Sequence, residues 1–217
     1  DELCDAVNAA FGCASNQCCD KFIRIGSELS CNPSHRSRLL KQIASKVKNR
    51  SELLDEIANT RIFISTLSSI SGRDELFRLK QFDIAIIDEA SQVLEPQLIG
   101  VLSKVDKFIL IGDHNQLSTI VLQNQYNSAI KEHALLDVGI TDCSMSLFER
   151  LLHQCMHNQW EHAYAQLIHQ GRMHKEIALF PSQSFYNNKL FPLLDWQLRP
   201  LQLIEQASDS LNAIVAH

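Results

Sequence analysis

The stretch Phe82–Gln92, FDIAIIDEASQ, is an apolar run that ends in two acidic residues. The runs RIFISTL (61–67) and KFILIGD (107–113) have the same apolar character. Such nearly continuous runs are typical of strands that are covered on both faces of a parallel sheet. Between the last two runs, EPQLIGVLSKV (95–105) predicts a helix with Pro96 in its first turn. The stretch therefore predicts a β-α-β unit and an α/β fold, with both strands ending in acids.

Hydrophobic spacing predicts the apolar faces of two helices. The helix at 95–105 is expected to bury Leu98, Ile99, Val101, Leu102 and Val105. An amphipathic helix over 1–11 is expected to use Leu3, Ala6, Val7 and Ala10.

Further elements are predicted on both sides of the β-α-β unit. A short strand is expected at 21–27, and two helical pieces follow between 33 and 57. SMSLFERLLHQCM (144–156) predicts a helix with a serine cap, either Ser144 or Ser146. The stretch 163–190 predicts a short strand and then a helix that stops near Pro181, because proline interrupts helical hydrogen bonding.

Composition and charge restrict the class of protein. The chain has 217 residues, of which 45% are hydrophobic and 21% charged, as in an ordinary globular protein. Its net charge of −5 argues against a stand-alone nucleic-acid module. A basic run over 36–50 is compatible with phosphate contact or with a solvated helix face. No apolar stretch approaches the roughly 18 residues that cross a bilayer, so we expect no membrane contact and a cytoplasmic location.

The seven cysteines are an odd number and contain no CxxC pair. This pattern favours reduced thiols over a disulfide framework. A cluster of four near the N-terminus leaves two alternatives open, a zinc site or free thiols. Its members are Cys13, Cys18, Cys19 and Cys31.

Polar side chains follow the ends of two of the predicted strands. Asp88 and Glu89 follow one strand, and Asp113 and Gln116 follow the next. In an open parallel sheet, ligands bind beyond the carboxyl ends of the strands. An aspartate there can hold Mg²⁺, and a glutamate can orient or deprotonate an attacking water. The alternative is that the two acids cap a following helix, although a second acid-tipped strand favours a shared crevice.

Four ordered segments resemble superfamily 1 helicases of the 5′-to-3′ branch, which contains the nonsense-mediated-decay RNA helicase and the Dna-two-type helicase-nucleases. FDIAIIDEASQ and KFILIGDHNQL resemble motifs II and III, and RIFISTLSS resembles the strand that precedes motif II. HQGRMHKEIALFPSQSFYNNKL resembles the next motif, Q-Y-R-M-H-P-x-I with a following Phe-Tyr pair. Together they span about Arg61–Leu190 and imply a RecA-like P-loop NTPase sheet with flanking helices.

The resemblance implies a role for each matching residue. Asp88 would coordinate Mg²⁺, Glu89 would polarise the hydrolytic water, and Gln116 would sense the terminal phosphate of ATP. Arg172 would be an arginine finger, although an arginine in such a turn is also a common surface cation. The remaining implied contacts are nucleotide contacts by Gly112, Asp113 and Gln170, and weaker nucleic-acid backbone contacts by Thr66 and Ser68.

The chain departs from the family pattern in two ways. Gly171 and Lys175 stand where many relatives have Tyr and Pro, which puts the loop geometry around Arg172 in doubt. No G-x-x-x-x-G-K-[ST] phosphate-binding loop occurs in the 217 residues, and the late motifs are also missing. We therefore expect an internal piece of a longer helicase that is inactive alone. Its sheet would lack a strand, and the exposed edges would favour a homodimer.

The expected organisation has two parts. Residues 1–160 would form part of a first RecA-like domain, with a helical insertion at about 30–60. Residues 161–217 would form a linker and the start of a second RecA-like domain. The intact protein would couple Mg-ATP hydrolysis to unwinding of DNA, single-stranded or duplex, with RNA as an alternative substrate.

Two other functions remain as alternatives. GDHN together with DE is compatible with a metal-dependent phosphoesterase, but only His114 of the nine histidines lies at a predicted strand end. A degenerate RecA-like module that serves as a protein or nucleic-acid scaffold would explain the missing phosphate loop. Retention of Asp88, Glu89, Gln116 and Arg172 argues against that scaffold.

Overall fold

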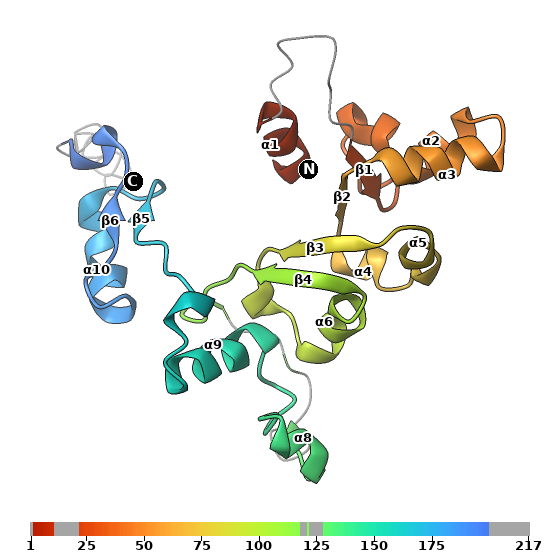
Figure 1. The fold of residues 1–217 in the computed structure, drawn as a ribbon. Coiled ribbons are helices and arrows are strands. Elements are labelled where there is room, and N and C mark those ends of the chain that lie inside the picture. Colours follow the sequence, from red (N-terminus) through yellow and green to blue (C-terminus); the bar gives the residue numbers. More distant parts are fainter. Residues whose placement is uncertain (1, 11–21, 118–120, 122–127, 200–217) are drawn as a thin grey trace, which may run out of the picture. The chain divides into compact units, whose positions relative to one another are not determined.

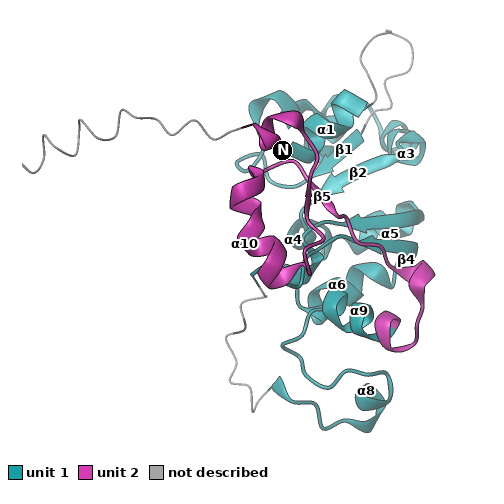
Figure 2. Cartoon of the chain, turned by 90° about the vertical axis from the view of Figure 1, so that its left-hand side faces the viewer, with its two compact units in different colours: residues 1–154 teal, residues 155–217 magenta. Residues whose placement is uncertain are grey.

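The computed structural model describes residues 2–10, 22–117, 121 and 128–199. The chain divides into two compact units, residues 1–154 and residues 155–217, which Figure 2 shows in different colours. Among the described residues, the first unit contains two pairs of parallel strands, and the second contains one short pair. Helices connect the strands within each unit, so the α/β class is confirmed.

In the described part of the chain each strand pairs directly with one neighbour, and the two strands of each pair are parallel (Figure 1). In the first unit, Ile87 is in register with Leu110, so two strands end at the same edge. The pairs are β1 (Phe22–Ile25) with β2 (Ile62–Ser65), β3 (Phe82–Ile87) with β4 (Val105–Leu110), and β5 (His169–Gln170) with β6 (Phe191–Pro192).

The helices of the first unit are short. They are α1 (Glu2–Ala10), η1 (Pro33–Arg38), α2 (Leu40–Lys46), α3 (Arg50–Asn59), α4 (Leu67–Ile70), α5 (Asp74–Leu79), η2 (Ala90–Gln92), α6 (Glu95–Leu102), α8 (His133–Asp137) and α9 (Leu147–His157), whose last three residues belong to the second unit. The second unit adds η3 (Glu161–Ala163), α10 (Lys175–Phe185) and η4 (Asp195–Leu198). Within the described ranges, none of these helices is long and apolar enough to span a membrane.

Helix α6 forms the crossover between β3 and β4 and covers one face of that pair. Its Leu98 is fully buried and lies in a cluster with Leu147 of α9. Ala85, Ile87 and Leu110 of the strands pack against this cluster. Arg150 of α9 fastens the layer, because its guanidinium binds both carboxylate oxygens of Glu95 at the start of α6, at 2.8 and 2.5 Å.

The opposite face of β3 and β4 corrects one expectation. We expected both faces to be covered, but Ile84 and Ile86 are 47% and 64% exposed, and Ile109 and Ile111 are also exposed. Side chains alternate along a strand, so these residues point away from the face that α6 covers. The apolar runs predict the strands correctly. They do not indicate whether another element covers the second face of the pair.

Three helix details also differ from the expectations. Ile99 is 52% exposed, because the buried stripe of α6 contains Leu98, Val101 and Leu102 and turns Ile99 outward. In α1 the buried residue is Cys4, while Leu3 is 59% exposed. Helix α10 continues through Pro181 to Phe185, since proline forfeits one hydrogen bond without always ending a helix.

Candidate functional site

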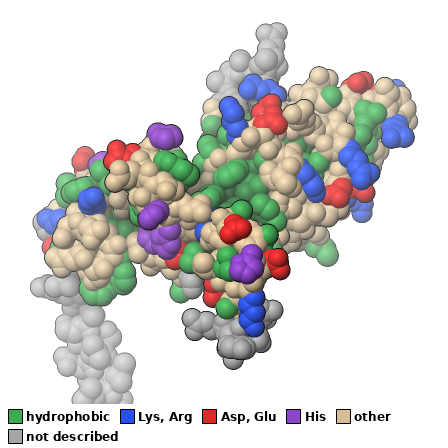
Figure 3. Space-filling view, turned by 60° about the horizontal axis from the view of Figure 1, so that its bottom comes forward, with side chains coloured by type: hydrophobic (Ala, Val, Ile, Leu, Met, Phe, Trp, Pro, Cys, Tyr) green, Lys and Arg blue, Asp and Glu red, His purple; other side chains and the backbone are tan. Residues whose placement is uncertain are grey.

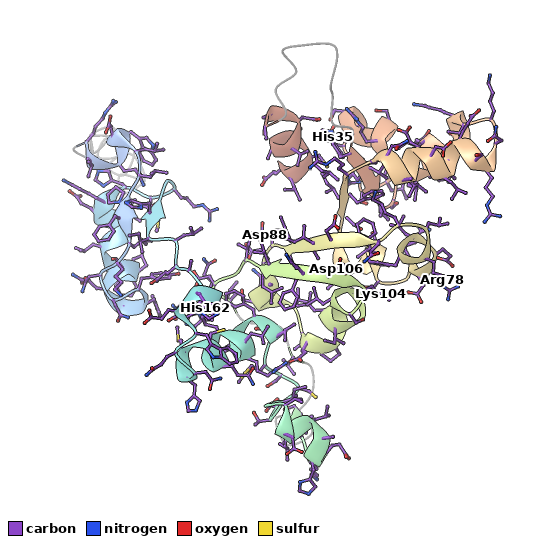
Figure 4. All side chains as sticks on the ribbon, in the orientation of Figure 1. His35, Arg78, Asp88, Lys104, Asp106 and His162 are labelled. Carbon is purple, nitrogen blue, oxygen red and sulfur yellow. The ribbon has the colours of Figure 1, made fainter. Side chains whose placement is uncertain are left out.

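The end of β3 places the two acids in a tight turn. Both Asp88 and Glu89 are exposed, and Asp88 lies beyond the carboxyl end of β3 (Figure 4). Glu89 has φ 53° and ψ 35°, the left-handed region that residues other than glycine seldom adopt. The Glu89 N–H donates to Asp88 Oδ1 at 3.0 Å, and Gln92 Nε2 donates to Glu89 Oε2 at 2.9 Å. Strained backbone of this kind gathers at functional sites.

The helix-cap alternative for these acids is wrong. The element that follows is the three-residue turn η2, and no side chain caps it. Helix α6 begins only at Glu95, with Leu94 at its N-cap and no side-chain cap bond. The Asp88 carboxylate accepts a hydrogen bond from the backbone N–H of Glu89, and the Glu89 carboxylate accepts one from the side-chain amide of Gln92. Neither of these bonds caps a helix.

The end of β4 is locked to the same turn. The β3–β4 ladder continues past the strands, because Ile111 N–H donates to Ile87 O and Ala90 N–H donates to Ile111 O, both at 2.8 Å. The Asp113 N–H then donates to the hydroxyl of the buried Ser91 at 3.2 Å. A Cβ atom on Gly112 would lie 2.9 Å from the Ser91 backbone nitrogen. The approach of the two turns therefore requires glycine at position 112.

Asp113 organises the turn after β4. One carboxylate oxygen accepts from the Asn115 N–H at 3.0 Å, and the other accepts from Gln116 Nε2 at 2.8 Å. An open hollow beside this turn is lined by Gln92, Asn115, Gln116 and Leu117. Asp113 thus orients the Gln116 amide at this hollow. Gln92, which also lines the hollow, donates a hydrogen bond to Glu89.

The second unit carries the other predicted site residues in one turn. Gln170 Oε1 accepts from the N–H groups of Arg172 at 2.9 Å and Met173 at 2.7 Å. The Arg172 side chain is exposed. Lys175 occupies the first helical position of α10, where a proline would also fit, so this departure leaves the turn intact. At Gly171 a Cβ would meet only Leu194 Cδ1, at 3.8 Å.

Candidate nucleic-acid contacts are exposed but unremarkable in geometry. Thr66 is the N-cap of α4, and its hydroxyl accepts from the Ser69 N–H at 3.3 Å, while Ser68 is exposed. In the basic run, Arg38 lies over the ring of Phe22 at 5.1 Å. Figure 3 shows Lys and Arg side chains scattered among acidic and polar ones on the face in view. On the face in view, the described residues therefore form no basic stripe.

The carboxylates at the strand ends are hard oxygen ligands, which suit a metal such as Mg²⁺. No group of three or more His, Cys, Asp or Glu that could hold a metal occurs among the described residues. This does not fit a phosphoesterase, which needs several protein ligands. It fits Mg²⁺, which is held by one or two carboxylates together with substrate phosphates and waters. Of the four clustered cysteines only Cys31 is described; it is buried and free, and the other three lie outside the described residues.

The structure therefore brings five predicted residues to adjacent strand ends of the first unit: Asp88, Glu89, Gly112, Asp113 and Gln116. Gln170 and Arg172 lie together in the second unit. Sequence reasoning missed Ser91, whose hydroxyl joins the two turns, and Gln92, whose amide binds the Glu89 carboxylate. Their polar side chains, two and three residues after Glu89, were the available signal.

Comparisons with known proteins identify the family of the chain. A family model described as AAA domain matches residues 14–124, and another with the same description matches residues 143–216. The DNA replication ATP-dependent helicase/nuclease DNA2 of Bos taurus is 30% identical over 170 residues, 78% of this chain and 14% of that protein. The DNA polymerase alpha-associated DNA helicase A of Schizosaccharomyces pombe is 32% identical over 154 residues, 71% of this chain and 20% of that protein.

A third relative is the uncharacterized ATP-dependent helicase MJ0104 of Methanocaldococcus jannaschii, 31% identical over 156 residues. That alignment covers 71% of this chain and 20% of the relative. The chain thus spans a fifth or less of the length of these relatives. The matches, the parallel strand pairs and the acid-tipped strand ends agree, and the chain belongs to the AAA-domain family, with the RecA-like P-loop fold of superfamily 1 helicases.

Proposed function

We propose that the chain is part of the motor of an ATP-dependent DNA helicase, and that the ends of β3 and β4 form its hydrolytic centre. The observation that carries this proposal is the joined pair of turns. Ser91 and Gly112 hold the turns together, and one hollow is lined by Gln92, which binds Glu89, and by Gln116, which binds Asp113. Relatives named as helicases share this segment.

Each residue has a role that suits its chemistry. ATP bound with Mg²⁺ supplies the phosphoryl group whose transfer to water releases the energy for movement. Asp88 holds the Mg²⁺ as the carboxylate ligand, and Glu89 orients the attacking water and accepts its proton. Gln116 donates or accepts a hydrogen bond at the terminal phosphate and the water. Arg172 neutralises charge on the transferred group.

We expect the 217 residues alone to bind ATP weakly and not to hydrolyse it. The backbone N–H groups and the lysine of a G-x-x-x-x-G-K-[ST] loop cradle the phosphates in P-loop enzymes, and these 217 residues contain no such loop. The test is Mg²⁺-dependent ATPase activity of the 217-residue chain, with Glu89→Gln as the control. Turnover that Glu89→Gln abolishes would contradict the expectation, whereas its absence supports a requirement for a loop from another segment.

The absent loop also favours the scaffold alternative, in which the module binds a partner without hydrolysis. A single experiment separates the two. The natural reading frame that contains residues 1–217 should hydrolyse ATP faster in the presence of single-stranded DNA. If that protein binds DNA but shows no ATPase activity with or without single-stranded DNA, the scaffold function is established instead. Replacing DNA with RNA in the same assay identifies the nucleic acid.

Nucleic-acid contact is proposed at Thr66 and Ser68, whose hydroxyls are exposed at the start of α4. Replacing Ser68 with alanine leaves the Thr66 cap in place, so it removes one hydroxyl without unfolding the helix. The expected result is weaker binding of single-stranded DNA with an unchanged salt dependence, since no charge is lost. Equal affinity of Ser68→Ala and the natural chain would remove Ser68 from the interface.

Self-association of the isolated chain is a separate proposal. Among the described residues, β3 and β4 each pair with one strand, so each has one free edge. Free parallel edges favour pairing with a second chain. Light scattering should give a dimer mass that falls to the monomer mass on dilution. A monomer mass at every concentration would exclude a dimer.

A further inference from the structure

A second amide holds the turn that carries Arg172. Gln197 lies in η4 and is 0% exposed. Its Oε1 accepts from the N–H groups of Leu193 at 2.9 Å and Leu194 at 2.7 Å. Its Nε2 donates to the carbonyls of Gln170 at 3.0 Å and Met173 at 2.6 Å. An amide side chain has two acceptor sites and two donors, so Gln197 is fully satisfied.

The two carbonyls that Gln197 binds are the two ends of the Arg172 turn. Inside the turn, Gln170 Oε1 accepts from the N–H groups of Arg172 and Met173, and its Nε2 donates to Met173 O at 2.7 Å. The Met173 carbonyl oxygen therefore accepts hydrogen bonds from the side-chain amides of both Gln170 and Gln197. One amide shapes the turn from within, and Gln197 fixes its ends from the segment that follows β6.

His174 fastens the same two segments on the other side of the turn. It is 5% exposed, and its Nδ1 accepts from the Glu176 N–H at 3.2 Å, which makes it the N-cap of α10. Its Nε2 must then carry the proton, since it lies 2.6 Å from the carbonyl oxygen of Arg199. Gln197 and His174 together tie residues 170–176 to residues 193–199.

A buried leucine would fill the space of Gln197 equally well, so packing alone does not require an amide here. Burying an amide has a free-energy cost that only complete hydrogen bonding offsets. All four bonds of Gln197 end on backbone groups, and two of them end on the turn. We infer that Gln197 is a positioning residue, which sets the turn from Gln170 to Met173 and through it the direction of Arg172.

The consequence for catalysis rests on the proposed function, because it assumes that Arg172 meets the transferred phosphate. The geometric part does not depend on that assumption. Two variants separate an amide role from a packing role. Gln197→Leu keeps the bulk and removes all four bonds. Gln197→Glu keeps the shape and the acceptors, but its carboxylate places lone pairs against the carbonyls of Gln170 and Met173.

The first experiment measures amide hydrogen exchange by nuclear magnetic resonance in the 217-residue chain. In Gln197→Leu, exchange at Arg172 and Met173 should accelerate on the order of tenfold, as expected when a hydrogen bond of typical strength is lost. The matched internal control is the Ala178 N–H, which bonds to His174 O at 2.9 Å within α10 and should change little. Unchanged exchange at Arg172 and Met173 would overturn the inference.

Gln197→Glu keeps the test decisive if Gln197→Leu does not fold. Above the pKa of the new carboxyl group, the turn should exchange rapidly. Below that pKa the protonated carboxyl regains one donor, which can reach Met173 O, and protection of Arg172 should return. Burial of an ionised carboxylate is costly in itself and would weaken protection throughout the unit, so the positioning role predicts a pH dependence at Arg172 and Met173 that the Ala178 N–H does not share. Protection that is independent of pH in Gln197→Glu would therefore refute the positioning role.

The second experiment measures ATPase activity in the natural reading frame that contains the chain. If both proposals hold, Gln197→Leu lowers kcat with little change in KM for ATP, as does Arg172→Ala. If exchange accelerates in Gln197→Leu while Arg172→Ala leaves kcat unchanged, the positioning role stands and the catalytic role of Arg172 fails. If Arg172→Ala lowers kcat but Gln197→Leu does not, the positioning inference fails alone.

Discussion

Replacing Gly112 with alanine perturbs the contact that joins the two strand ends. The new Cβ would lie 2.9 Å from the Ser91 nitrogen, 3.2 Å from its Oγ and 3.3 Å from its Cβ. The nearest atom is backbone, so it cannot rotate away and the turn after β4 must shift. That shift stretches the Asp113 N–H to Ser91 Oγ bond, which is 3.2 Å long.

The expected cost follows from these contacts. Overpacking by one methyl group costs about 1–3 kcal/mol, and loss of the hydrogen bond adds about 1 kcal/mol. Gly112→Ala should therefore lower the free energy of unfolding by about 2–4 kcal/mol. The assay is urea unfolding of the 217-residue chain, followed by circular dichroism, with the midpoint and slope compared between variants.

Gly100 provides the matched control. It lies exposed within α6, and a Cβ there meets nothing within 4 Å. Alanine is favoured over glycine in a helix by about 1 kcal/mol, so Gly100→Ala should stabilise the chain. Opposite effects of the two substitutions would establish the close approach at Gly112. A Gly112→Ala variant as stable as the natural chain would refute the reasoning that the two turns are locked together.

Two further predictions concern ion pairs of the first unit. Arg150→Ala removes the bidentate partner of the Glu95 carboxylate, whose side chain is only 13% exposed. The free energy of unfolding should therefore fall by about 3 kcal/mol. A decrease below about 1 kcal/mol in urea unfolding would contradict this. The hydrogen bond and charge of Lys104 lower the pKa of Asp74 below its ordinary value. Asp74 thus contributes stability above its ordinary pKa of about 4, and loses it as the pH falls through the lowered pKa. In a carboxyl titration by nuclear magnetic resonance, Lys104→Gln should raise the midpoint of Asp74, and equal midpoints would refute the pair.

The strands were predictable because their signal is local. The runs that became β2, β3 and β4 are apolar and short, and each is bounded by polar residues. The acids at 88, 89 and 113 follow directly from where those strands end. Ser146 was predictable as a cap because it precedes an amphipathic run, and its Oγ accepts from the Glu149 N–H.

The rest depended on contacts that periodicity does not encode. The exposed face of β3 and β4 depends on which elements are present to cover it, and the pattern of Ile84 and Ile86 is the same in either case. Gln197 lies in a tail without a period, and only its four backbone partners reveal its role. The left-handed backbone of Glu89 is likewise fixed by its neighbours, since glutamate alone disfavours it.

The central claim is that Glu89 belongs to an ATP-hydrolysing centre at the ends of β3 and β4. The most direct measurement is the Mg²⁺-dependent, DNA-stimulated ATP turnover of the natural reading frame that contains this chain, with and without Glu89→Gln. Loss of the base should reduce kcat by about 10²–10⁴-fold while ATP binding is retained. Turnover by Glu89→Gln equal to that of the unaltered protein would contradict the account.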